Sequence, residues 1–152
     1  MAGGERRRGR RLLLGRRTYE IFAAHWPNAG EEEQALAEPL NRLPKYVAST
    51  TLSEPLAWQN ATLLPGNVAD AVAALKQDDE GDLRVIGSTQ LAQTLTEHDL
   101  VDEFRLMIDP LVLGAGKALF ADDGGLRMLR LVASEVTSTG AILATYARAD
   151  GT

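Results

Sequence analysis

Three stretches of the sequence contain hydroxyl side chains, in two cases beside a glycine and in one beside two arginines, that could bind phosphate. In each, hydroxyl residues follow closely on an apolar run typical of a buried strand, and two stretches contain a glycine. Glycine lets a phosphate approach the backbone, and arginine and hydroxyl groups donate hydrogen bonds to it. The residues are Gly15, Arg16, Arg17 and Thr18 in the first stretch, Ser49, Thr50 and Thr51 in the second, and Gly87, Ser88, Thr89 and Gln90 in the third.

The adjacent arginines make the first stretch the strongest candidate. Arg16 and Arg17 stand where a helix is expected to begin, and positive charge opposes the dipole at that end of a helix, so capping does not explain them. Taken singly, each stretch also fits an ordinary turn or helix cap, and this structural interpretation stays open for each. Together they favour one long phosphorylated ligand, such as a dinucleotide.

Other catalytic and metal-binding patterns do not fit the sequence. It contains no cysteine, and its two histidines, His25 and His98, form no metal-ligand pattern. The "LGAGKALF" run lacks the glycine and hydroxyl residue that a P-loop needs, because Leu111 and Ala118 occupy those positions. Ser88 is not in a nucleophile elbow. The sequence therefore offers no metal site and no identifiable catalytic acid, base or nucleophile.

The elements around these stretches alternate between strand and helix patterns. This alternation predicts an α/β fold of three layers, with a mixed, mostly parallel sheet flanked by helices and a C-terminal antiparallel hairpin. Ligands bind such sheets at the carboxyl ends of the strands, where all three stretches fall. Strands are expected at 12–14, 45–49, 61–64, 83–87 and 102–109, helices at 18–26, 67–77 and 88–95, a broken helical stretch at 31–43 with a second turn opening at Pro39, and a hairpin within 128–148 turning near Gly140.

Length and charge limit the kinds of partner and the number of domains that the chain can have. The 152 residues carry a net charge of −5, which combines an arginine-rich start with an acidic body. The acidic body makes nucleic acid an unlikely partner, and no apolar run reaches the roughly 20 residues of a membrane span. The apolar run after the arginines is also too short for an export signal. We expect a disordered basic leader at 1–11 and one cytoplasmic domain at 12–150.

The order and spacing of several blocks resemble a known family. These are "LLLGRRTYEIFAAHWP", "LPKYVASTTL", "GDLRVIGSTQLAQTLTEHDLVDEFRLMIDPLVLGAGKALF" and the closing strands, covering about residues 12–148. They are similar to the dihydrofolate reductase-like superfamily, and more closely to stand-alone members of the riboflavin-biosynthesis reductase family, the C-terminal domain of the bifunctional deaminase–reductase. The resemblance implies a mixed α/β sheet, NADPH binding, hydride transfer to a small heterocyclic or carbonyl substrate, and often a homodimer.

The resemblance also assigns roles to residues. It implies that Gly15, Arg16, Arg17 and Thr18 contact cofactor phosphates and that Ser49 and Thr50 lie near the adenosine end. Gly87, Ser88, Thr89 and Gln90 would line the pyrophosphate and nicotinamide side. Leu113 and Gly114, in "LVLGAG", would lie near the substrate or in a dimer contact.

The start of the chain departs from the family pattern. Members open with a central apolar strand, a loop facing nicotinamide and substrate, and a helix, whereas here eleven residues rich in arginine and glycine precede Leu12. Arginines buried without partners would be costly in a central strand. The chain is therefore expected to lack this element, through a truncated or misread start or through loss. The strands at 83–87 and 102–109 would then close together, leave a slot, or borrow a strand from a partner.

Four functions remain open at this point. The first is an NADPH-dependent reductase of this family, and the second is a nucleotide-binding module that has lost catalysis. The third is a structural or regulatory homodimer, and the fourth is a nucleic-acid binder that uses its arginine-rich start. Saturable binding of NADPH would distinguish the first two from the others, and turnover would distinguish the first from the second.

Overall fold

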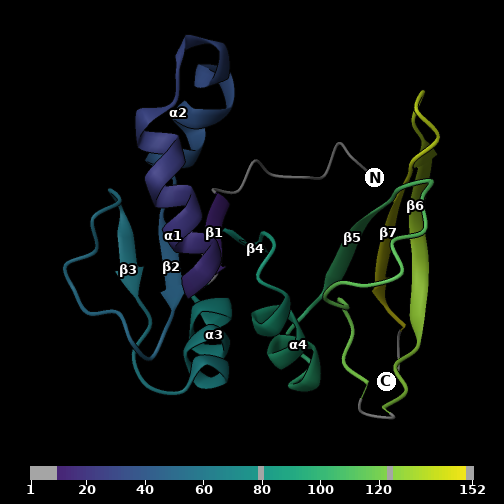
Figure 1. The fold of residues 1–152 in the computed structure, drawn as a ribbon. Coiled ribbons are helices and arrows are strands. Elements are labelled where there is room, and N and C mark those ends of the chain that lie inside the picture. The colour runs from purple at the N-terminus through teal and green to yellow at the C-terminus, as the bar shows by residue number, and fades with distance from the viewer. Residues whose placement is uncertain (1–9, 79–80, 123–124, 150–152) are drawn as a thin grey trace.

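A computed structural model describes residues 10–78, 81–122 and 125–149. Four parallel strands form its first sheet, in the order β3-β2-β1-β4 (Figure 1). Their bounds are Arg10–Gly15 for β1, Lys45–Ala48 for β2, Ala61–Leu63 for β3 and Asp82–Val85 for β4. The expected α/β class is confirmed, and β1, β2 and β4 are neighbours, so the three candidate stretches leave the same edge of the sheet.

Helices cover both faces of this sheet. The helices α1 (Arg16–His25) and α2 (Gln34–Arg42) pack on one face, and α3 (Val68–Gln77) and α4 (Thr89–Glu97) pack on the other. Short 3₁₀ turns at Trp26–Asn28 and Glu31–Glu33 connect α1 to α2. The α3 helix starts as the sequence predicts, because the side chain of Asn67 accepts a hydrogen bond from the backbone N–H of Asp70.

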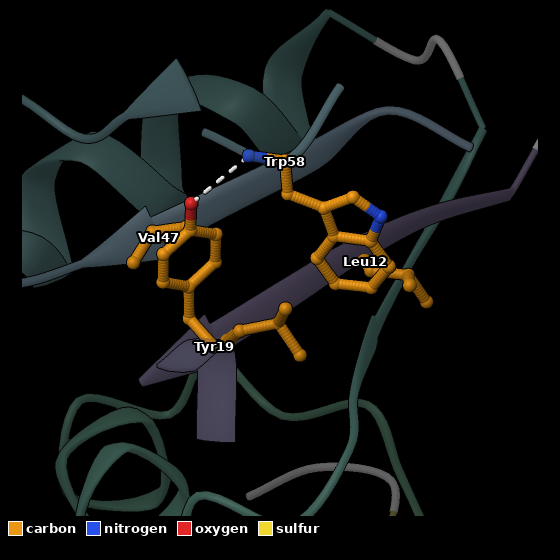
Figure 2. Close-up of a cluster of buried hydrophobic side chains, with 5 residues drawn as sticks. Leu12, Tyr19, Val47 and Trp58 are labelled. Atoms are coloured by element: carbon orange, nitrogen blue, oxygen red, sulfur yellow. Dashed lines mark hydrogen bonds between the residues drawn. The ribbon is translucent and has the colours of Figure 1, made fainter. Parts of the chain in front are cut away.

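The leucines of β1 are buried because both faces of the strand are covered. Leu12 and Leu14 pack with Tyr19 of α1, Val47 of β2 and Trp58, as Figure 2 shows for part of this cluster. The Tyr19 hydroxyl accepts a hydrogen bond of 3.2 Å from the backbone N–H of Trp58. On the opposite face, Leu13 packs with side chains of α3 and α4. A continuous apolar run is typical of a parallel strand buried on both sides.

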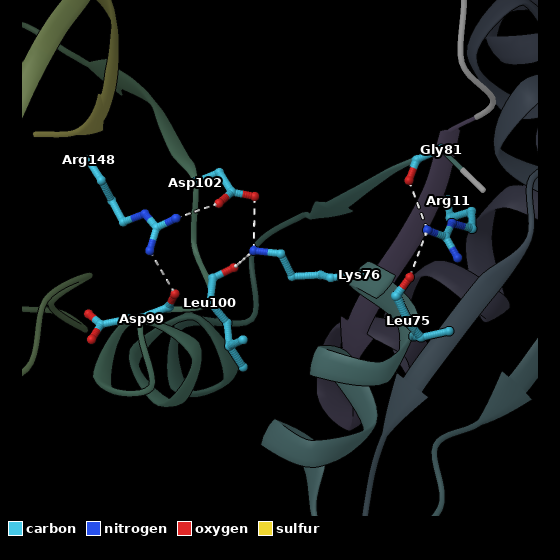
Figure 3. Close-up of polar contacts among 8 residues, drawn as sticks. All are labelled: Arg11, Leu75, Lys76, Gly81, Asp99, Leu100, Asp102 and Arg148. Carbon is cyan, nitrogen blue, oxygen red and sulfur yellow. Dashed lines mark hydrogen bonds and ion pairs between the residues drawn. The ribbon is translucent and has the colours of Figure 1, made fainter. Parts of the chain in front are cut away.

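The first strand begins two residues earlier than expected. Arg10 and Arg11 belong to β1 rather than to the basic leader, the rest of which lies outside the described residues. Arg11 is only 4% exposed. Its guanidinium donates to the carbonyl of Gly81 at 2.8 Å and to that of Leu75 (Figure 3), and it pairs with Asp78. These partners offset the cost of burying its charge.

A second buried charge fixes β2 to its surroundings. Lys45 has no exposed surface, and its ammonium donates to the carbonyls of Asn41 and Gln59 at 2.7 and 2.9 Å. It also lies 4.2 Å from the ring centroid of Trp58, a cation–π contact. Burial lowers the pKa of Lys45 from 10.5 to about 8. The group is therefore still mostly protonated at neutral pH and ties α2 to the loop before β3.

The remaining strands form a separate antiparallel sheet. It contains β5 (Glu103–Ile108), β6 (Leu129–Val136) and β7 (Ile142–Arg148) in the order β5-β7-β6. The hairpin expected near Gly140 is present, with β6 and β7 as its arms. Among the described residues, β4 pairs only with β1 and β5 only with β7. The structure thus shows two sheets where one mixed sheet was expected, and the strands β4 and β5 do not close on each other.

Polar contacts link the two sheets. Lys76 of α3 donates to the carbonyl of Leu100 and pairs with Asp102 at 3.0 Å, and Asp102 also pairs with Arg148 of β7 at 3.1 Å (Figure 3). Arg148 further donates to the carbonyl of Asp99. These contacts hold the start of β5 and the end of β7 close to helix α3, although no described strand of one sheet pairs with a strand of the other.

One helix differs from expectation. Pro39 was expected to open a second short turn, but it lies inside the continuous helix α2. The break in the 31–43 stretch comes earlier, where the 3₁₀ turn of Glu31–Glu33 changes to α-helix at Gln34. Leu43 closes the helix by donating its N–H to the Pro39 carbonyl, an acceptor that proline retains although it has lost its own N–H.

Candidate functional site

The junctions after β1 and β4 are joined into one site. The side-chain hydroxyl of Ser88 accepts a hydrogen bond of 2.9 Å from the backbone N–H of Gly15, and it donates to the carbonyl of Ile86. A methyl group at Gly87 would lie 3.4 Å from the hydroxyl oxygen of Thr18. The structure therefore brings the Gly15–Thr18 and Gly87–Gln90 stretches together, although they are separated by about half the chain.

Both helices that leave these junctions start without side-chain caps. Gly15 and Ser88 are the N-cap residues of α1 and α4, and neither makes a side-chain cap hydrogen bond. Neither helix has an acidic residue in its first turn. The first N–H groups of a helix have no partner within the helix and carry the positive end of its dipole. Two such ends side by side can receive an anion.

The backbone at the β4–α4 junction adopts an unusual conformation. Gly87 has a φ of +57°, and the next residue, Ser88, is also left-handed with φ of +55° and ψ of +57°. Left-handed geometry is uncommon for a non-glycine residue and persists when surrounding contacts fix it. Here the two hydrogen bonds of the Ser88 hydroxyl fix it. Ser88 thus serves to shape the site, and its hydroxyl is already engaged.

The arginine pair adds positive charge beside these helix ends. Arg16 and Arg17 are exposed, and Arg16 forms an ion pair of 2.6 Å with Glu20 one turn along α1. The side chain of Arg17 makes no hydrogen bond or ion pair with the described residues. The Arg17 guanidinium is thus available to a ligand, whereas one nitrogen of the Arg16 guanidinium already binds Glu20.

The third stretch combines an available and an engaged hydroxyl. The Ser49 hydroxyl accepts hydrogen bonds from the N–H groups of Thr51 and Leu52, at 3.1 and 3.0 Å, so it stabilises its own turn. This supports the turn interpretation for Ser49. Thr50 and Thr51 are both exposed at the same edge, and the Thr51 hydroxyl lies 3.4 Å from that of Ser49, which leaves the Thr50 hydroxyl as the more available one.

The predicted substrate residues are not part of this arrangement. Leu113 is 75% exposed, and a Cβ at Gly114 would meet nothing within 4 Å. Their segment, between β5 and β6, is tied to α4 through a hydrogen bond from Gln93 to the carbonyl of Ala118. Two hollows, each lined by Phe104 and Leu129 among others, contain none of the phosphate-site candidates and neither Leu113 nor Gly114. The role of Leu113 and Gly114 stays a prediction.

Sequence reasoning missed two features of the site. The hydrogen bond between Gly15 and Ser88 joins residues 73 positions apart, so no local pattern could reveal it. Glu20 was not singled out either, although its spacing of four residues from Arg16 is the usual spacing for an ion pair on a helix.

Comparisons with known proteins show the family to which this fold belongs. The RibD C-terminal domain family matches residues 1–143. The uncharacterised protein YyaP of Bacillus subtilis (strain 168) is 31% identical over 137 residues, which cover 89% of this chain and 72% of YyaP. The chain therefore belongs to the RibD C-terminal domain family, a reductase-like family.

Solved structures share the same fold. A putative riboflavin biosynthesis protein from Shewanella sp. PV-4 superposes with a TM-score of 0.73 at 24% identity, covering 94% of this chain and 75% of that one. Dihydrofolate reductase from Enterococcus faecalis, in a structure complexed with NADP(H), gives a TM-score of 0.62 at 15% identity, covering 93% of this chain and 75% of that one. The fold is thus dihydrofolate reductase-like, as the sequence predicted.

None of the described helices is both long enough and apolar enough to cross a membrane.

Proposed function

We propose that the chain is a cytoplasmic NADPH-dependent reductase that transfers hydride to a small heterocyclic or carbonyl substrate. One observation carries this proposal. Two helix N-termini without side-chain caps meet at the edge of a parallel sheet, joined by the Ser88–Gly15 hydrogen bond and flanked by Arg16 and Arg17. Membership of the RibD C-terminal domain family supports the reductase assignment.

The residues present fit the phosphates of a dinucleotide. Gly87 is exposed and has no Cβ, so a phosphate can reach the backbone N–H groups at the start of α4. The uncapped start of α1 and the Arg17 guanidinium provide further donors for an anion. Thr50 lies at the end of the neighbouring strand β2, where the adenosine end is expected.

NADPH would supply the hydride, and the protein would supply binding, orientation and a dry site. In this division of roles, Ser88 orients the two junctions relative to each other, and the two helix starts hold the phosphates. Arg16 and Arg17 favour the cofactor with the additional phosphate.

A second candidate function is a nucleotide-binding module with impaired catalysis. It is favoured by the two unpaired strand edges, because β4 ends at the proposed cofactor site and has no strand partner on its β5 side among the described residues. A site with one wall open admits water and orients a substrate poorly. Both candidates require NADPH binding, and turnover separates them.

The substitution Gly87→Ala is expected to weaken NADPH binding while the protein stays folded. The added methyl group would narrow the approach to the start of α4 and would lie in ordinary van der Waals contact with Thr18, 3.4 Å from its hydroxyl oxygen. It would also strain the backbone by about 1 kcal/mol, since Gly87 has a positive φ. Gly66→Ala is the matched control, because Gly66 has a φ of +62° with nothing near its Cβ position. Binding is measured by NADPH fluorescence and stability by thermal unfolding.

The two variants should lose similar stability, and only Gly87→Ala should lose affinity, by about tenfold or more. Unchanged affinity in Gly87→Ala would show that the cofactor does not approach this strand end. An equal loss of affinity in both variants would show that backbone strain at a positive φ, and not blocked access to the start of α4, weakens binding.

A further inference from the structure

A hollow of about 420 Å³ lies where helix α4 ends and the antiparallel sheet begins. Its lining includes Thr96 of α4, Phe104 of β5, Leu129 of β6 and Arg148 of β7. The volume falls within the range of about 300 to 1,000 Å³ that is usual for small-molecule sites. Helix α4 begins at Thr89, beside the proposed cofactor site, so the hollow lies at the other end of the helix from that site.

Aromatic and aliphatic side chains form one wall of the hollow. The rings of Phe104 and Phe120 pack edge to face with their centroids 5.4 Å apart. Phe104 lines this hollow, and both rings line a smaller hollow of about 240 Å³ that shares Phe104 and Leu126 with the larger one. Leu126 is 84% exposed, so its side chain is largely uncovered. A ligand with an aromatic ring would cover these groups and remove their apolar surface from water.

Arg127 provides a positive charge that the described residues hold only loosely. Its Nε lies 3.8 Å from the Asp99 carboxylate, and its Nη2 donates to the carbonyl of Glu97 at 3.5 Å. Hydrogen bonds from a guanidinium to an oxygen are normally about 2.7 to 3.2 Å long. Arg148, by contrast, donates to the Asp99 carbonyl and to the Asp102 carboxylate, each at 3.1 Å (Figure 3). Arg127 is therefore the lining cation whose N–H donors are most available to a ligand.

The charges of the lining favour an anion with a single charge. Arg127 and Arg148 line the larger hollow together with Asp99, which leaves an excess of one positive charge. Glu97 lines only the smaller hollow, beside Phe120, so the anionic group of a ligand belongs in the larger one. A carboxylate matches this charge, and its two oxygens match the planar fork of a guanidinium.

We propose that this hollow is a second binding site, for a small aromatic carboxylate, whose ring packs against Phe104 and whose carboxylate binds Arg127. Apolar walls with a few polar groups that orient the ligand are the usual composition of a small-molecule site. The lining residues are all outside the proposed cofactor site, and the inference does not depend on NADPH binding.

Calorimetric titration of 1-naphthoate into the native chain tests the site. We expect saturable binding of one molecule per chain with a dissociation constant of about 1 mM or lower. The uncharged analogue 1-naphthamide should bind more weakly by about tenfold or more, because it lacks the charge that Arg127 recognises. Replacing Arg16 and Arg17 with alanine should leave the affinity for 1-naphthoate unchanged, which distinguishes this hollow from the proposed phosphate site.

Substitutions locate the binding site within the chain. Arg127→Gln should weaken 1-naphthoate binding by about tenfold or more and leave 1-naphthamide binding unchanged, whereas Phe104→Leu should weaken the binding of both. Arg130→Gln is the matched control, because Arg130 is a nearby exposed arginine that lines neither hollow. It should change neither affinity. Circular dichroism checks that each variant is folded.

The comparison of 1-naphthoate with 1-naphthamide uses the native chain, so it tests charge recognition even if a variant fails to fold. The proposal would be overturned by an absence of saturable 1-naphthoate binding, by equal affinity for the two probes, or by an Arg127→Gln variant that binds 1-naphthoate as tightly as the native chain. An equal loss in Arg130→Gln would also overturn it, because it would show a general effect of charge and not a site at Arg127.

Discussion

Replacing both Arg16 and Arg17 with alanine is expected to weaken NADPH binding by about 10- to 100-fold and NADH binding much less. A hydrogen bond to a charged group contributes about 1.5–3 kcal/mol, which corresponds to this range of affinity. The Arg17 side chain has no partner among the described residues, whereas Arg16 already pairs with Glu20. We therefore expect Arg17 to account for most of the effect.

The measurement is a titration of each cofactor into the native chain and the double variant at fixed salt concentration. Arg42→Ala provides the matched control, since it removes one exposed arginine that lies far from the site and pairs weakly with Glu38 at 4.0 Å. It should change neither affinity. Equal losses for NADPH and NADH in the arginine variant would mean that these side chains do not recognise the additional phosphate.

Supplying a strand between β4 and β5 is expected to raise NADPH turnover by about 100-fold and to raise the melting temperature. Both strands have an unpaired edge within the described part of the chain, and the two sheets are linked through polar contacts such as Lys76–Asp102. A strand placed there would join the sheets and complete a wall beside Gly87. Displacement of reacting groups by about 1 Å can cost about 100-fold in rate.

The experiment joins the first strand and helix of a family relative to the chain ahead of Arg10. A flexible glycine–serine extension of the same length is the control, because it adds residues without a strand pattern. Only the strand and helix should raise turnover and stability together. If the native chain already turns over as fast as the extended one, the open edge between β4 and β5 does not limit catalysis.

The sequence predicts the elements of this fold well and their long-range relations poorly. The "LLL" run and the Asn67 cap are local signals, and the structure confirms both. The apolar run predicts a strand that starts at Leu12 and leaves Arg10 and Arg11 in the basic leader, whereas both belong to β1. Arg11 is compatible because Asp78 and the carbonyls of Leu75 and Gly81 surround it, and these partners lie 64 to 70 positions away.

In the candidate site, too, local features could be predicted from the sequence and long-range contacts could not. Glycine and hydroxyl residues at strand ends, with the arginine pair, identified the Gly15–Thr18 and Gly87–Gln90 stretches from local pattern. The contact that unites them, from Gly15 to Ser88, depends on β1 and β4 being neighbours, and so does the left-handed conformation of Ser88. Ser49 was also a candidate from local pattern, but the structure shows that its hydroxyl stabilises its own turn.

Direct titration of NADPH into the native chain tests the central claim, that the joined junctions of β1 and β4 form a dinucleotide site. The expected result is saturable one-site binding that is at least about tenfold tighter for NADPH than for NADH and that weakens at high salt, because exposed charges are screened. The same titration with Gly87→Ala should show weaker binding than with Gly66→Ala. No saturable binding, or binding that Gly87→Ala leaves unchanged, would contradict the claim.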